Sequence, residues 1–159
     1  MESLSSSFVL QEDNPTRAYV AKAVASGQRH VPLDVNPALA NLSAQLVEVR
    51  GDELVLRFTA PRAATQGNGV VGGGTLASML DLAMAMTVLA RLEPGFTCST
   101  ISLTVNMQTA GQEGDFLAVA GVDKVGRKVT FAHATLYDAQ SSRVIANAIS
   151  SLAIVPLQK

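Results

Sequence analysis

The sequence predicts an α+β fold in which an antiparallel sheet wraps around one long apolar helix. Residues 75–92 are apolar on nearly every face, as expected for a helix that is covered on most sides. Four strand-like segments follow this helix and cover residues 97–109, 115–125, 128–137 and 144–155. The turns between them are too short to hold crossover helices, so we expect these strands to be antiparallel neighbours.

The elements before the long helix are shorter. Residues 14–26 begin with Asn-Pro-Thr and predict a capped helix that ends near Gly27. Residues 28–40 contain two prolines and predict mostly irregular structure. Residues 43–49 and 53–59 alternate apolar and polar side chains on either side of an Arg-Gly-Asp turn, which predicts a hairpin.

Length and composition describe one ordinary domain. The chain of 159 residues can bury a core unaided, and we expect a leader, short helix and loop over residues 1–40 before the main domain over residues 41–159. A formal charge of −1 gives no bias toward nucleic acid. One cysteine, Cys98, and two histidines exclude a disulfide framework and the common zinc clusters, and they favour a reducing, cytoplasmic location.

Neither a signal peptide nor a membrane span is expected. Residues 1–13 lack the basic start and apolar run of a signal peptide. The longest apolar stretch, residues 76–92, is interrupted by Asp81 and Arg91 and is shorter than the roughly 20 residues that cross a bilayer. This stretch is therefore predicted to be a core helix, and no membrane partner is expected.

A glycine-rich loop precedes the long helix. Residues 67–72 match the G-x-G-x-x-G pattern of dinucleotide-binding proteins, but residues 61–66 separate them from the preceding strand and antiparallel hairpins follow the helix. Glycines at a helix start leave backbone N–H groups free to point at a ligand, where they stabilise an oxyanion. Alternatively, the glycines at positions 72–74 only let a buried helix approach the sheet.

Asp81 is the only charged residue between Arg62 and Arg91. Burying an unpaired carboxylate costs several kcal/mol unless hydrogen bonds compensate. A carboxylate on an apolar helix, beyond a helix start that can bind an oxyanion, is what acyl transfer requires. The alternative is a carboxylate in the second helical turn that interacts with the helix dipole or with solvent.

Residues 66–81 (QGNGVVGGGTLASMLD) resemble the hotdog-fold acyl-CoA thioesterases, particularly the phenylacetyl-CoA and 4-hydroxybenzoyl-CoA types. The resemblance implies a hotdog fold and assigns three roles. Gln66 orients the thioester or water, the Gly73 N–H binds the thioester oxygen with Gly74 beside it in the substrate site, and Asp81 supplies the carboxylate. Many members carry a histidine where this chain has Gly72.

The same resemblance implies a homodimer or homotetramer. In the family a hydroxyl from the partner subunit often completes the site, and Ser99 and Thr100 occupy the matching stretch, with Ser99 preferred as catalytic and Thr100 as substrate-binding. Ordinary strand propensity is the alternative for both. Arg127 and Lys128 are candidates for holding CoA phosphates, and solvated turn charges are the alternative there.

The predicted function is therefore hydrolysis of an acyl-CoA thioester without a metal or cofactor. The alternative is an acyl-CoA-binding protein without turnover, for which Gly72 is the main support. A hotdog dehydratase ranks last, because it would need a histidine that residues 66–81 lack.

Overall fold

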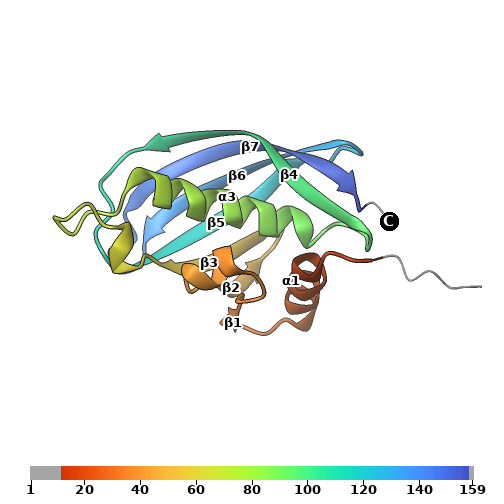
Figure 1. The fold of residues 1–159 in the computed structure, drawn as a ribbon, viewed down its shortest axis with the longest axis horizontal. Helices are drawn as coiled ribbons and strands as arrows, with labels where there is room; N and C mark the ends of the chain where they lie inside the picture. Colours follow the sequence, from red (N-terminus) through yellow and green to blue (C-terminus); the bar gives the residue numbers. More distant parts are fainter. Residues whose placement is uncertain (1–11, 158–159) are drawn as a thin grey trace, which may run out of the picture.

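The computed structural model describes residues 12–157 and shows there a seven-stranded antiparallel sheet curled around one long helix (Figure 1). The helices are α1 (Pro15–Ser26), α2 (Pro37–Asn41) and α3 (Gly73–Leu89), together with a short 3-10 helix, η1 (Arg62–Ala64). The strands are β1 (Val31–Pro32), β2 (Gln45–Arg50), β3 (Glu53–Thr59), β4 (Phe96–Met107), β5 (Asp115–Lys124), β6 (Val129–Asp138) and β7 (Val144–Pro156). The predicted α+β architecture is confirmed.

The strand order is β1-β2-β3-β5-β6-β7-β4, which corrects one expectation. β4 and β5 are consecutive in the sequence but are not neighbours, because β4 pairs with β7 and β5 pairs with β3. Residues 108–114 connect the two strands across the end of the sheet (Figure 1). This connection lets the strands from β3 to β4 surround α3, which contacts each of them. β4, with twelve residues, is consequently an outermost strand with one unpaired edge.

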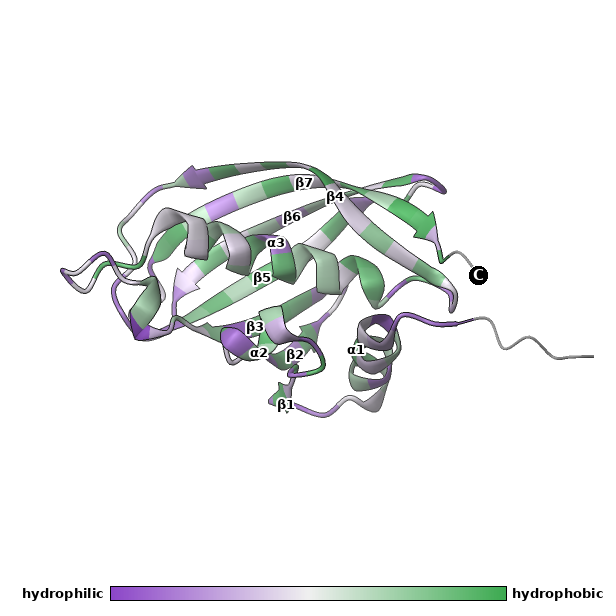
Figure 2. Cartoon of the chain, in the orientation of Figure 1, coloured by the Kyte–Doolittle hydropathy of each residue, from purple (hydrophilic) through white to green (hydrophobic). Residues whose placement is uncertain are grey.

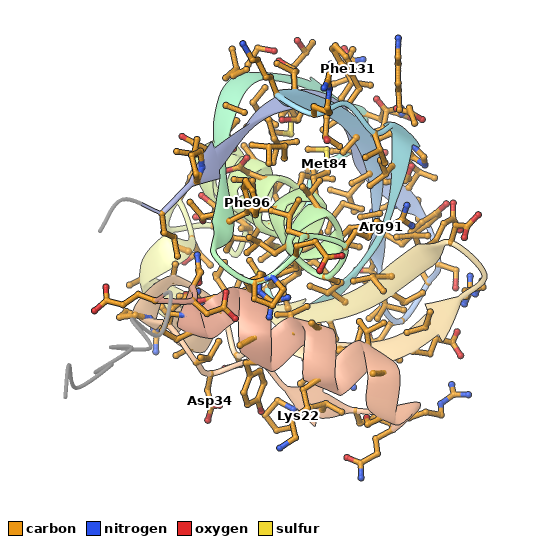
Figure 3. All side chains as sticks on the ribbon, turned by 90° about the vertical axis from the view of Figure 1, so that its right-hand side faces the viewer. Lys22, Asp34, Met84, Arg91, Phe96 and Phe131 are labelled. Carbon is orange, nitrogen blue, oxygen red and sulfur yellow. The ribbon has the colours of Figure 1, made fainter. Side chains whose placement is uncertain are left out.

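α3 supplies the centre of the hydrophobic core. Met79 and Met84 are fully buried, as are Phe58 and Phe116 of the sheet. Figure 3 shows Met84 between α3 and the sheet, whereas Phe131 points away from the outer face. Figure 2 shows hydrophobic residues along the strands that surround α3, and buried residues alternate with more exposed ones along β6, as expected for a strand with one face on a core.

The N-terminal part packs on the same core. α1 is capped by Asn14 and ends at Gly27, whose φ of 67° is left-handed, in agreement with the prediction. Residues 28–40 are less irregular than predicted, because they contain β1 and most of α2. Residues 1–11 of the expected leader lie outside the described part. Within residues 12–157, no helix is long and apolar enough to cross a membrane.

Candidate active site

The glycine-rich loop before α3 is fixed to the connection between β4 and β5. The Val71 N–H donates to the Gly111 carbonyl at 2.8 Å, and the Glu113 N–H donates to the Gly69 carbonyl at 2.9 Å. Gly69 has a φ of 78°, a conformation that glycine adopts without strain. These bonds hold the start of α3 beside the end of β4.

The start of α3 has free backbone donors. Its N-cap, Gly72, makes no side-chain hydrogen bond, and within residues 12–157 the N–H groups of Gly73 and Gly74 have no acceptor. A Cβ at Gly73 would meet only the Met107 Cε, at an ordinary 3.6 Å, and a Cβ at Gly74 would meet nothing within 4 Å. Packing within this chain therefore does not require glycine at either position. The two N–H groups are available to a ligand oxygen.

A cavity of about 300 Å³, which we call the α3 cavity, lies beside this helix start. Two of the predicted site residues, Gln66 and Gly73, line it together. The side-chain amide nitrogen of Gln66 lies 3.8 Å from the position that a Cβ would take at Gly72. The apolar part of the wall includes Val70, Val71, Leu76 and Met107. The arrangement combines amide donors with an apolar pocket, as small-molecule sites do.

Asp81 lies farther along α3, half-buried against β4. Its Oδ1 accepts a hydrogen bond of 2.8 Å from the Thr100 hydroxyl. Burial, and to a smaller extent the charge of the Asp81 carboxylate, together raise the pKa of the nearby Cys98 thiol from 9.0 to about 11. The thiol is therefore protonated at neutral pH and is a poor nucleophile. Asp81 is the candidate reactive group of this region.

Ser99 and Thr100 face opposite sides of β4. Successive strand residues alternate between faces, so the contact of Thr100 with Asp81 places Ser99 on the outer face of its own chain. Within one chain it is Thr100 that meets the carboxylate. The role predicted for Ser99 depends on a second subunit and stays a prediction.

Arg127 and Lys128 are exposed in the tight turn between β5 and β6. Gly126 is required there, because a Cβ would lie 2.2 Å from the Val129 carbonyl oxygen. Val129 and Ser99 both pair with the same residue of β7, which places the turn two strands from the Thr100 end of β4. The two cations are thus nearer to Asp81 than to the α3 cavity.

Both histidines lie away from these groups. His133 is on the outer face, where its Nδ1 is 2.7 Å from an Asp123 carboxylate oxygen. His30 lines a different cavity, beside Arg57 and Asp115. In the described part of the chain, no group of three or more His, Cys, Asp or Glu side chains is placed to hold a metal ion.

Residues 68–145 match the family described as the Thioesterase superfamily. A solved structure from Ralstonia eutropha, described as a thioesterase related to phenylacetic acid degradation, is 28% identical with a TM-score of 0.71, and the match covers 85% of this chain and 98% of that chain. A thioesterase family protein from Silicibacter pomeroyi is 25% identical with a TM-score of 0.72, covering 88% and 98% respectively. A Haemophilus influenzae thioesterase is 17% identical with a TM-score of 0.71, covering 78% and 86% respectively, and shares the fold. Among curated proteins no significant match was found.

Proposed function

The chain belongs to the thioesterase superfamily and has its hotdog fold, and from this premise we propose that it hydrolyses an acyl-CoA thioester to a free acid and CoA. Family membership supports thioester hydrolysis in general. The observation that carries the proposal for this chain is the uncapped start of α3, where the free Gly73 N–H and Gln66 line one cavity. The proposal that CoA is the thiol of the substrate is supported by the resemblance of residues 66–81 to acyl-CoA thioesterases.

The proposed reaction is an acyl transfer to water. The Gly73 N–H donates to the thioester oxygen, on which negative charge develops when the carbonyl carbon is attacked. Asp81 takes a proton from water while the water oxygen bonds to that carbon. The carbon–sulfur bond then breaks and the departing thiolate takes up the proton, which yields the acid and the CoA thiol. Direct attack by the carboxylate, followed by hydrolysis of the anhydride, is the alternative.

The separation of the two reacting groups favours a site shared between two copies. Gly73 and Asp81 are eight residues apart on α3, which corresponds to about 12 Å along the helix axis. Asp81 does not line the α3 cavity. Reacting atoms must approach to about 3–3.5 Å. A carboxylate from a second copy meets this requirement more readily than the one in the same chain.

The free edge of β4 supports a homodimer. An exposed edge strand pairs readily with another chain, and this one carries the exposed apolar residues Ile101, Leu103 and Met107. In an antiparallel pair of β4 strands centred between Leu103 and Thr104, Thr100 of one copy lies opposite Met107 of the other. Thr100 binds Asp81 and Met107 borders Gly73, so this pairing brings the carboxylate of one copy toward the cavity of the other.

Subunit mixing tests the shared site. Asp81→Asn and Gly73→Val dimers are each expected to be nearly inactive. After denaturation and refolding together, each mixed dimer has one site with both residues intact. Half of the dimers are mixed, and one of the two sites in each mixed dimer is active. We therefore expect about a quarter of the wild-type activity. Recovery of no activity, although mixed dimers are shown by tagged pull-down, would contradict the shared site.

The function itself is tested by thiol release from a panel of aryl- and fatty acyl-CoAs. Asp81→Asn is expected to lower kcat by at least about 10²-fold, the usual contribution of a positioned acid or base. Asp34→Asn, at an exposed carboxylate, is the matched control and should retain wild-type kcat. An Asp81→Asn protein with more than half of the wild-type rate would exclude the proposed role.

A binding protein without turnover is the second candidate, because Gly72 replaces the histidine of many family members. Such a protein would bind acyl-CoA in calorimetry and release no thiol. We place the reaction in the cytoplasm, a proposal supported by the single cysteine, Cys98.

A further inference from the structure

Met107 is the movable part of the α3 cavity wall. It is the last residue of β4, and its side chain is 47% exposed in the single chain, where the proposed β4 pairing would place Thr100 of a second copy opposite it. Val71 and Leu76, in the same wall, are buried. Methionine has three rotatable bonds and adapts to irregular space. Met107 can therefore change its conformation when a ligand enters, whereas Val71 and Leu76 are held by the core.

The far side of the α3 cavity is closed by tight packing. Gly111 lines the cavity, and a Cβ there would lie 3.0 Å from Phe116 and 3.3 Å from Leu76. Phe116 is fully buried. The residues on this side cannot move away from a ligand. The size of a bound group is therefore limited by Met107 on the other side of the cavity.

A second cavity, of about 210 Å³, flanks the opposite side of the α3 start and is lined by Thr75, Ser78 and Leu82 of that helix. It includes neither Gly73 nor Gln66. Gly73 therefore borders only the α3 cavity of the two. If the thioester oxygen binds the Gly73 N–H, the acyl group lies next to the α3 cavity. Leu82 provides a control position in a cavity that this geometry does not use.

We propose that Met107 limits the size of the acyl group, and that the substrates are CoA thioesters of small apolar acids. This inference rests on the proposed thioesterase function. The thioether covers the side of Gly73, because its Cε lies 3.6 Å from the position of a Cβ there. The cavity volume of about 300 Å³ is at the lower end of the roughly 300–1,000 Å³ of ligand pockets.

The test compares kcat/KM for butanoyl-, hexanoyl-, octanoyl- and decanoyl-CoA in three Met107 variants. Met107→Ala should raise the ratio of decanoyl to butanoyl by at least about 10-fold, and Met107→Phe should lower it by a similar factor, the scale of one methylene in an apolar pocket. Met107→Leu should retain the wild-type order of preference. Leu82→Ala, with its Tm measured in parallel, should also retain that order.

The outcomes separate this inference from the proposed function. If the wild type hydrolyses these substrates but the Met107 variants change all of them in parallel, Met107 does not limit size. A shift in preference with Leu82→Ala instead would place the acyl group in the opposite cavity and overturn the inference. If the wild type releases no thiol, calorimetry with the same four acyl-CoAs measures whether Met107 limits the size of the acyl group that binds. Absence of binding and turnover alike would overturn the proposed function as well.

Discussion

Replacing Gly73 with alanine is expected to change stability and activity in opposite directions. The new methyl group would touch only the Met107 Cε, at 3.6 Å, so the folded chain accepts it without strain. Gly→Ala at a compatible position stabilises by about 0.4–1 kcal/mol, because the unfolded chain loses freedom. For a chain of this size that raises Tm by about 1–4 °C.

The same methyl group projects into the α3 cavity, where the thioester oxygen would approach the Gly73 N–H. Displacing that oxygen weakens the donor in the transition state, and loss of one such donor costs about 10²–10³-fold in kcat. Thermal unfolding followed by circular dichroism gives Tm, and thiol release from the best acyl-CoA gives kcat. The reasoning is wrong if Gly73→Ala retains more than half of the wild-type kcat.

Gly67→Ala is the matched control for this experiment. Gly67 has a φ of 85° and would meet nothing within 4 Å, so alanine there costs about 1–2 kcal/mol of backbone strain. We expect lower stability with kcat close to wild type below the transition temperature. A fall of kcat in step with Tm in both variants would instead indicate that the glycines serve only the fold.

Three further predictions follow from named contacts. Thr130→Val should raise Tm by about 2–4 °C, because in the described part the buried Thr130 hydroxyl has no hydrogen-bond partner and such a group costs about 1 kcal/mol or more; an unchanged or lower Tm would contradict this. Hydrogen bonding to Arg17 lowers the pKa of Asp13 from 3.8 to about 2, so its stabilising effect is present above pH 3.8 and lost as pH falls toward 2. In acid unfolding, the stability of Asp13→Asn should therefore increase less between pH 2 and 3.8 than that of the wild type. An identical pH profile for the two proteins would contradict this role of Asp13. Reversing Arg127 and Lys128 to glutamate should raise KM for acyl-CoA about fivefold, the effect of two exposed ion pairs worth about 0.5 kcal/mol each, and an equal rise for the acyl-pantetheine would exclude phosphate contacts.

The spacing of apolar residues predicted the helices and strands better than it predicted which strands pair with each other. The apolar character of residues 75–92 identified α3, although the helix begins two residues earlier, at Gly73, and ends at Leu89. Short turns argued against crossover helices but did not indicate on which edge β4 would lie. The prolines of residues 28–40 predict mostly irregular structure, whereas Asn36 caps α2 by accepting from the Leu39 N–H. Cap and turn signals use the same residues, and only the packing of Leu39 in the core decides between them.

The proximity of two candidate site residues was predictable, because it depends on local sequence. Gln66 and Gly73 line one cavity because both flank the same short loop. Which of Ser99 and Thr100 faces α3 within one chain was not predictable, because β4 has a bulge between Thr100 and Ser102 that reverses its alternation. Counted back from the core residue Val105, an unbroken strand would turn Ser99 toward α3. Register shifts of this kind leave no clear trace in a single sequence.

The structure thus divides the candidate chemistry of one chain into two halves. The oxyanion donors lie at the start of α3 beside the end of β4, and the carboxylate lies in the middle of α3, bound by Thr100 near the beginning of β4. In the proposed homodimer the two β4 strands run in opposite directions, so pairing along their edges would bring the donors of one copy toward the carboxylate of the other. Activity should therefore depend on the register of β4 pairing as strongly as on Asp81 itself, whereas the core around α3 requires only one chain.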